Sequence, residues 1–269
     1  MMNTYLKIIS YAAVFCLAAY SYCFPETSGK INIVATTTHI GSILSEIGGE
    51  KVGVITVVPG GMCPGHFDIK PNTARRISKS DIFITNTYEK WAGDLFARSE
   101  RKKSLKYEMS TRGSWMLPDV NITAAEEIMN LLAEYDEANE NYYRKNYVDY
   151  VEKVRTAAKN IKESVSFEGI RVICSEMQKD FAEWLGFSVL KTYGRPEDLT
   201  LQQMAGIAYA GKNENVELVI DNLQSGGSSL KQLSKEINAA HVTLTNFPLD
   251  GSYINTLINN TNLIKQALK

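Results

Sequence analysis

The chain has 269 residues, of which 44% are hydrophobic and 22% are charged, and its formal net charge is −1. This composition is typical of a globular protein with a sizeable core, and it excludes disorder, collagen-like repeats and a coiled coil as the main architecture. A nucleic-acid binder usually carries a basic excess, and this chain has none. Its one basic cluster, residues 101–103, is interpreted as a solvated turn.

Residues 1–23 have the pattern of a signal peptide. Lys7 precedes about a dozen mostly apolar residues, which is short for a membrane span of about 20 residues. Ala19 and Ser21 form a small-x-small cleavage pattern. Cys23 raises the alternative of a lipid anchor, although Tyr22 before it is not the small residue that lipid attachment prefers. A retained anchor helix is a third alternative. We expect the mature chain to be periplasmic or otherwise extracytoplasmic.

Residues 24–135 predict a first α/β lobe. Apolar, β-branched runs alternate there with helical patterns, as in parallel sheets that are buried on both faces. The expected strands are residues 31–35, 52–58, 82–85 and 105–107, and the expected helices are residues 40–47, 72–78, 91–97 and 124–133.

Residues 136–165 predict a helix that links two lobes. From residue 137 to about 165 the chain has no Pro or Gly, and its apolar residues recur at spacings of three and four. At 1.5 Å per residue such a helix measures about 42 Å. It is long enough to run along both lobes as a rigid spine.

Residues 166–269 predict a second lobe of the same kind. The expected strands are residues 172–174, 187–190, 218–220 and 242–245, and the expected helices are residues 180–185, 201–210, 229–237 and 253–268. The predicted fold is therefore α/β, with two lobes that each contain an open, mostly parallel sheet with flanking helices, joined by one long rigid backbone helix.

Chemically useful side chains gather where these strands end. In open α/β sheets, ligands bind beyond the carboxyl ends of the strands. Cysteine, histidine and methionine together with a carboxylate suit a transition-metal ion. The strand-end candidates are His39, Cys63, His66, Cys174, Glu176 and Asn246. His241 opens the last strand at the opposite edge and is expected at the surface, while Arg195 follows another strand as either an anion contact or a surface ion pair.

One loop resembles a known family. Residues 61–71, GMCPGHFDIKP, resemble the "G-x-D-P-H-x-Y-x-P" loop of the zinc- and manganese-binding solute proteins of ABC importers, cluster A-I. Weaker resemblances to the same family extend over residues 31–268, at residues 47–52, Ser80-Asp81, Trp115 with Pro118, residues 136–139 with Tyr143 and Asn146, and Tyr253 with Asn259. The resemblance implies two lobes joined by one rigid helix, with a metal ion between them.

The resemblance also assigns the site, and the chain departs from it. His66 corresponds to the first ligand, with Gly65 inserted before it, and Glu176 corresponds to the third. Gly113 stands where the second ligand, a histidine, is usual, and Asn246 where the fourth, an aspartate, is usual. In one interpretation the site is rebuilt with Cys63, Cys174, His39, Met62 or Met177, which favours Zn(II) or Cu(I). In the other, the site has decayed and binds a metal chelate or a small organic molecule.

The two mature cysteines, Cys63 and Cys174, leave alternatives of their own. They are metal ligands, they pair as an interlobe disulfide, or Cys174 is simply a buried strand residue. A thiol enzyme built on Cys63 and His66 has no clear third orienting group, and the phosphate-loop and dinucleotide patterns are absent from the sequence. An adhesin is a third class that the sequence neither favours nor opposes.

These observations predict a function. We expect a monomeric, non-enzymatic solute-binding protein that captures a transition-metal cargo, zinc first and manganese, iron or copper as other candidates. Its expected partner is an ABC permease in the membrane, and nucleic acid is not a partner.

Overall fold

The computed structural model describes residues 29–67, 71–99, 104–226 and 230–269. The expected signal peptide with Cys23, the basic cluster at 101–103 and the expected helix start at 229 lie outside these ranges. Residues 31–269 form one compact unit, described below by itself. No helix among the described residues combines the length and the apolar character that crossing a membrane requires.

The first lobe contains a parallel sheet of four strands in the order β2-β1-β3-β4. Its strands are β1 (Ile31–Ala35), β2 (Val52–Thr56), β3 (Ile82–Asn86) and β4 (Leu105–Met109), and its helices are α2 (Thr38–Gly48), α3 (Pro71–Ile77) and α4 (Lys90–Arg98). Ile33 of β1 pairs with Val54 on one side and with Ile82 on the other. All five residues of β3 are buried, whereas edge strand β4 buries only Met109. The central strands are therefore the unbroken apolar runs that the sequence pattern predicts.

The second lobe repeats this arrangement, with the strand order β6-β5-β7-β8. Its strands are β5 (Arg171–Ser175), β6 (Ser188–Tyr193), β7 (Leu218–Asn222) and β8 (Ala240–Leu244), and its helices are α7 (Lys179–Leu185), α8 (Leu201–Asn213), α9 (Lys231–Glu236) and α10 (Tyr253–Ala267). In both lobes the chain reverses its direction of travel across the sheet between the two central strands. That reversal makes the loops after β1, β3, β5 and β7 the topological switch points at which ligands bind in such folds.

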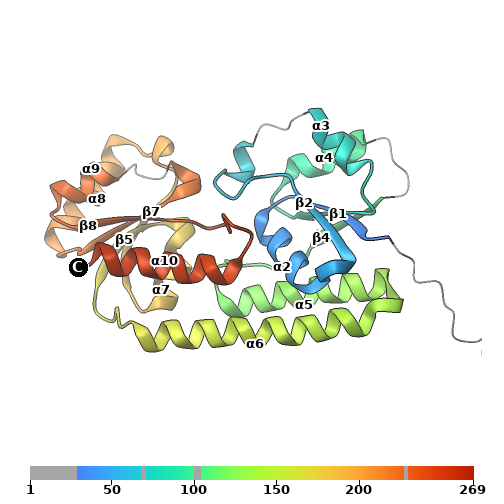
Figure 1. Cartoon of the computed structure of the whole chain (residues 1–269). Coiled ribbons are helices and arrows are strands. Elements are labelled where there is room, and N and C mark those ends of the chain that lie inside the picture. Colours follow the sequence, from blue (N-terminus) through green and yellow to red (C-terminus); the bar gives the residue numbers. More distant parts are fainter. Residues whose placement is uncertain (1–28, 68–70, 100–103, 227–229) are drawn as a thin grey trace, which may run out of the picture. The chain divides into compact units, whose positions relative to one another are not determined.

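Helices α5 (Pro118–Tyr135) and α6 (Glu140–Ser164) lie side by side, and the longer α6 continues to the second lobe and connects the two (Figure 1). Helix α5 is longer than the predicted 124–133, because Pro118 occupies its first turn, where a missing N–H costs nothing. The predicted first turn of α6 is instead a 3-10 turn, Glu137–Asn139. There Asp136 accepts hydrogen bonds from Asn139 Nδ2 at 2.8 Å and from Tyr143 Oη at 2.6 Å. The 25 residues of α6 span about 38 Å.

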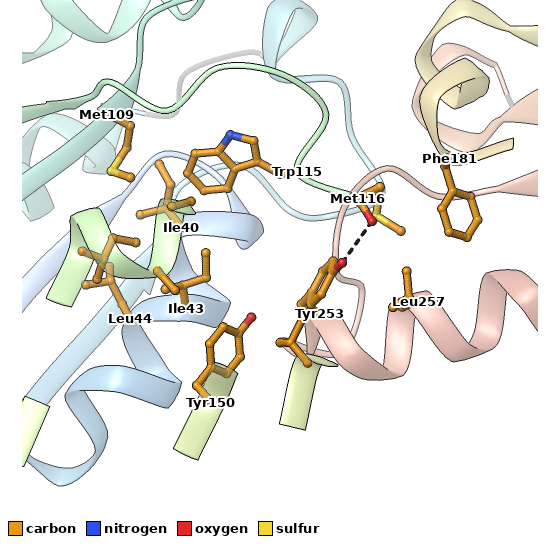
Figure 2. Packing of buried hydrophobic residues seen from close by; sticks show 14 of the residues in the cluster. Ile40, Ile43, Leu44, Met109, Trp115, Met116, Tyr150, Phe181, Tyr253 and Leu257 are labelled. Carbon is orange, nitrogen blue, oxygen red and sulfur yellow. Dashed lines mark hydrogen bonds between the residues drawn. The ribbon is translucent and has the colours of Figure 1, made fainter. Parts of the chain in front are cut away.

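A single cluster of buried side chains continues from one lobe into the other. It includes Ile43 and Met116 of the first lobe and Phe181 and Leu257 of the second. Tyr253 lies among them and is 1% exposed (Figure 2). Since continuous close packing resists shear, this shared core limits the movement of one lobe against the other.

The C-terminal helix is a second connection, which the sequence did not predict. Tyr253, its first residue, donates its backbone N–H to Ser42 Oγ at 3.1 Å and its hydroxyl to Met116 O at 3.0 Å (Figure 2). Helix α10 then packs on β8 of the second lobe. The predicted joining helix is confirmed, and α10 adds a tie from the opposite end of the sequence.

Candidate metal site

The loop after β2 is a stiff turn, held from three sides. Gly60 approaches Pro248 so closely that a Cβ at position 60 would lie 2.2 Å from the Pro248 carbonyl oxygen, so only glycine fits. The Gly60 carbonyl accepts a hydrogen bond from Gln224 Nε2 of the second lobe at 2.5 Å. On the other side, Trp91 Nε1 donates to Pro64 O at 2.9 Å. These contacts place Cys63 and His66 at a defined position opposite the second lobe.

Arg195 of the second lobe meets both of these residues. It follows β6, and its Nη1 lies against both ring nitrogens of His66, while its Nη2 donates to Cys63 Sγ at 3.1 Å. In the described part of the chain its ion-pair partner is Glu197, at 3.9 Å, and this pair is weak. Of the two predicted roles for Arg195, the surface ion pair is minor, and its main contacts are two candidate metal ligands.

Glu176 lies beside the same loop of the second lobe. It is exposed and comes directly after β5, in the 3-10 turn Glu176–Gln178. A Cβ added at Gly194 would lie 3.9 Å from Glu176 Oε2. Gly194 is therefore near Glu176, and the next residue, Arg195, contacts Cys63 and His66.

His39 and Asn246 form a separate contact between the lobes. His39 Nε2 donates to the Asn246 carbonyl at 2.5 Å, and the ring lies 5.8 Å from that of Trp115 and 5.1 Å from that of Phe247. The Asn246 side-chain oxygen accepts a hydrogen bond from Gln178 Nε2 at 2.8 Å. Burial lowers the pKa of His39 to about 4, so the imidazole is neutral at neutral pH. Its Nδ1 is buried and has no hydrogen-bond partner among the residues that the structure describes.

Cys174 lies inside the second lobe. It is fully buried in β5 within the apolar cluster, and burial raises the pKa of its thiol to about 12. Both Cys63 and Cys174 are free thiols in the structure. The position of Cys174 matches the alternative of a buried strand residue, so we leave it out of the site proposed below.

The structure also describes Gly113 and His241. The usual second ligand position, Gly113, has a φ of +96°, a conformation that a histidine side chain rarely adopts. His241 was expected at the surface, but this is wrong: its Nε2 bonds Asp221 at 2.7 Å, and its side chain is only 13% exposed. Burial alone would raise the pKa of Asp221, but hydrogen bonds from His241, Tyr193 and the Leu230 N–H hold it below its usual value.

Glu89 is a carboxylate that the sequence analysis missed. It follows β3 at a switch point of the first sheet, is 4% exposed, and accepts a hydrogen bond from the Asn86 N–H at 2.8 Å. Burial raises the pKa of Glu89, an effect that the hydrogen bonds partly offset. Its place in the sequence, three residues after the strand, was the available signal. Within the described ranges, no three His, Cys, Asp or Glu side chains gather closely enough to hold a metal ion.

Comparison with known proteins identifies relatives of the same kind. The chain is 27% identical over 160 residues to the metal ABC transporter substrate-binding lipoprotein ScbA of Streptococcus cristatus, covering 51% of this chain and 52% of that protein. It is 24% identical over 182 residues to the manganese ABC transporter substrate-binding lipoprotein scaA of Streptococcus gordonii, covering 59% of each. The chain thus spans about half to three-fifths of the length of these curated relatives. All are named as substrate-binding components and none as an enzyme.

Solved structures share the fold. The crystal structure of ZnuA aligns with a TM-score of 0.78 at 17% identity, covering 90% of this chain and 100% of that chain. The manganese-bound periplasmic metal-binding protein of Candidatus Liberibacter asiaticus aligns with a TM-score of 0.75 at 20% identity, covering 89% and 100%. The family described as zinc-uptake complex component A, periplasmic (ZnuA) matches residues 33–267. This chain belongs to that family.

Proposed function

We propose that this protein is the extracytoplasmic solute-binding component of an ABC importer, which captures a transition-metal ion between its lobes and delivers it to a membrane permease. One observation carries the proposal. The loop after β2 presents Cys63 and His66 to the Gly194-Arg195 pair of the other lobe, and Glu176 lies beside that pair. A thiolate, an imidazole and a carboxylate, contributed from both lobes, are the donors of such a site.

The donor set favours zinc as the cargo. Zinc binds sulfur, nitrogen and oxygen ligands tetrahedrally, and a thiolate disfavours the hard ions Mg²⁺ and Ca²⁺. Three protein donors and one water or cargo-borne ligand would complete four-coordination. Manganese, iron and copper are the other candidates, and a relative is named for manganese.

The joint of His39 and Asn246 supports delivery with small movements. With α10 and the shared core, it ties the lobes together. Loading and release would then proceed by rearrangement of the loops that carry Cys63, His66 and Arg195. A wide opening of the two lobes would break these buried contacts.

Thermal unfolding of the mature chain with and without metal tests the proposal. A ligand that binds only the folded state at 100 times its Kd raises the unfolding free energy by about 2.7 kcal/mol. We expect Zn(II) to raise Tm, and His66→Ala and Glu176→Gln to abolish the shift. Glu197→Gln, which removes a neighbouring exposed carboxylate, is the matched control and keeps the shift.

Elemental analysis of the protein purified from the periplasm provides a second measurement. About one transition-metal ion per chain is expected, and it is lost in His66→Ala. If none of Zn(II), Mn(II), Fe(II) and Cu(I) shifts Tm, the proposed function is wrong.

A further inference from the structure

A positive charge lies among the proposed ligands. Arg195 contacts the nitrogens of His66 and the sulfur of Cys63, and its side chain is 32% exposed. A guanidinium group keeps its charge at every physiological pH and offers only N–H donors. In the folded protein this group is therefore a cation that both candidate ligands already bind.

The contact with Arg195 and a bond to a metal ion use the same atoms. Arg195 Nη1 lies against both ring nitrogens of His66, so it covers whichever of them would bind a metal ion. Arg195 Nη1 lies 2.6 Å from His66 Nε2, whereas a zinc ion would lie about 2.0–2.1 Å from a ligating nitrogen. The two cannot occupy this space together, and their charges repel each other.

Among the described residues, the ion pair of Arg195 is with Glu197. Glu197 is 3.9 Å from Nη1 and 57% exposed, so water screens it. Arg195 reaches across 129 positions of the sequence to His66, and it connects a loop of the second lobe to a loop of the first. Displacing it would therefore free one loop from the other at the same step that loads the metal.

We propose that Arg195 is an internal competitor of the cargo: its guanidinium occupies the ligand atoms of His66 and Cys63 in the unloaded protein, and a metal ion binds only by displacing it. This inference rests on the proposed function, since it concerns the same site. It assigns Arg195 the role of setting metal affinity. A weakly held hard ion does not displace the guanidinium, whereas an ion that bonds strongly to sulfur and nitrogen does.

Calorimetric titration of Zn(II) into the mature chain tests the inference. Arg195→Gln removes the charge and is expected to bind Zn(II) about tenfold more tightly than the wild-type chain. Arg195→Lys keeps the charge but cannot contact His66 and Cys63 together, and it is expected to lie between the two. Lys191→Gln is the matched control, since it removes one exposed positive charge from β6 of the same lobe, and its affinity should equal that of the wild type.

The four outcomes separate this inference from the proposed function. Tighter binding by Arg195→Gln, with Lys191→Gln unchanged, supports competition. Binding by Arg195→Gln when the wild-type chain shows none supports it as well. Equal or weaker binding by Arg195→Gln overturns the inference and leaves the proposed function standing. If neither chain binds any metal, both are wrong.

Discussion

Two histidines of the first lobe occupy similar places and have opposite environments. His39 follows β1 and His66 follows β2, the neighbouring parallel strand, and both contact the second lobe. His39 is 6% exposed, bonds a backbone carbonyl and lies against two aromatic rings. His66 is exposed and contacts the long, charged side chain of Arg195. The difference teaches that a strand-end histidine can be a structural joint, as His39 is, or an exposed donor, which we propose for His66.

The largest expected effect is on the unfolding free energy, which alanine substitution of the two histidines should change by different amounts. His39→Ala opens a cavity between Trp115 and Phe247 and leaves the Asn246 carbonyl without its donor, so it should lower the unfolding free energy by about 2–4 kcal/mol at pH 7. His66→Ala, at an exposed position, should change it by less than about 0.5 kcal/mol. Urea titration of both variants measures these values. Equal losses would break the comparison.

The next effect concerns pH. The pKa of His39 is about 4 in the folded chain, against about 6.5 in an unfolded one, so the unfolded state binds the proton more readily between these values. The wild-type chain should therefore keep its full stability above about pH 6.5 and lose about 3 kcal/mol as the pH falls toward 4.

A variant without the His39 imidazole isolates the contribution of this group to the pH dependence of stability. His39→Gln, unfolded by urea at pH 7, 6, 5 and 4.5, should show a flatter pH profile than the wild type. His66→Ala is the control and should keep the wild-type slope in this range. A parallel decline in the wild type and His39→Gln would contradict the assignment to His39.

The smallest expected effect on stability concerns Arg195, the contact partner of His66. Arg195→Gln should lower the unfolding free energy of the metal-free chain by less than about 1 kcal/mol, since the lost contacts are partly exposed and screened. Chemical unfolding without metal, in the presence of a chelator, measures this value. A loss as large as that of His39→Ala would show that Arg195 is a structural joint as well.

Local patterns explain how much of the fold could be predicted. The runs at β1 and β3 are apolar because these central strands are buried on both faces, and such runs are visible in the sequence itself. Edge strand β4 is mostly exposed and therefore polar, so its sequence pattern was the weakest of the four. The length of α5 was underestimated because its first turn, from Pro118, carries few apolar residues.

The candidate site was predictable only in part. The sequence places Cys63, His66, Cys174 and Glu176 near strand ends, but it does not say toward which face each side chain points. Cys174 lies inside β5, which is buried on both faces, whereas Glu176 comes just after the strand in an exposed turn, and the sequence does not fix where the strand ends. His241 was misjudged because its partner Asp221 lies on a neighbouring strand.

The sequence by itself determined the two α/β lobes, the long helix between them and the glycine-rich loop that carries His66, because these depend on local periodicity and composition. Only the tertiary structure decided that Arg195 meets His66 and Cys63, that His39 joins the lobes, and that the start of α10 bonds to the first lobe. Those contacts join residues more than 100 positions apart. Their formation depends on how whole elements pack, which no local pattern encodes.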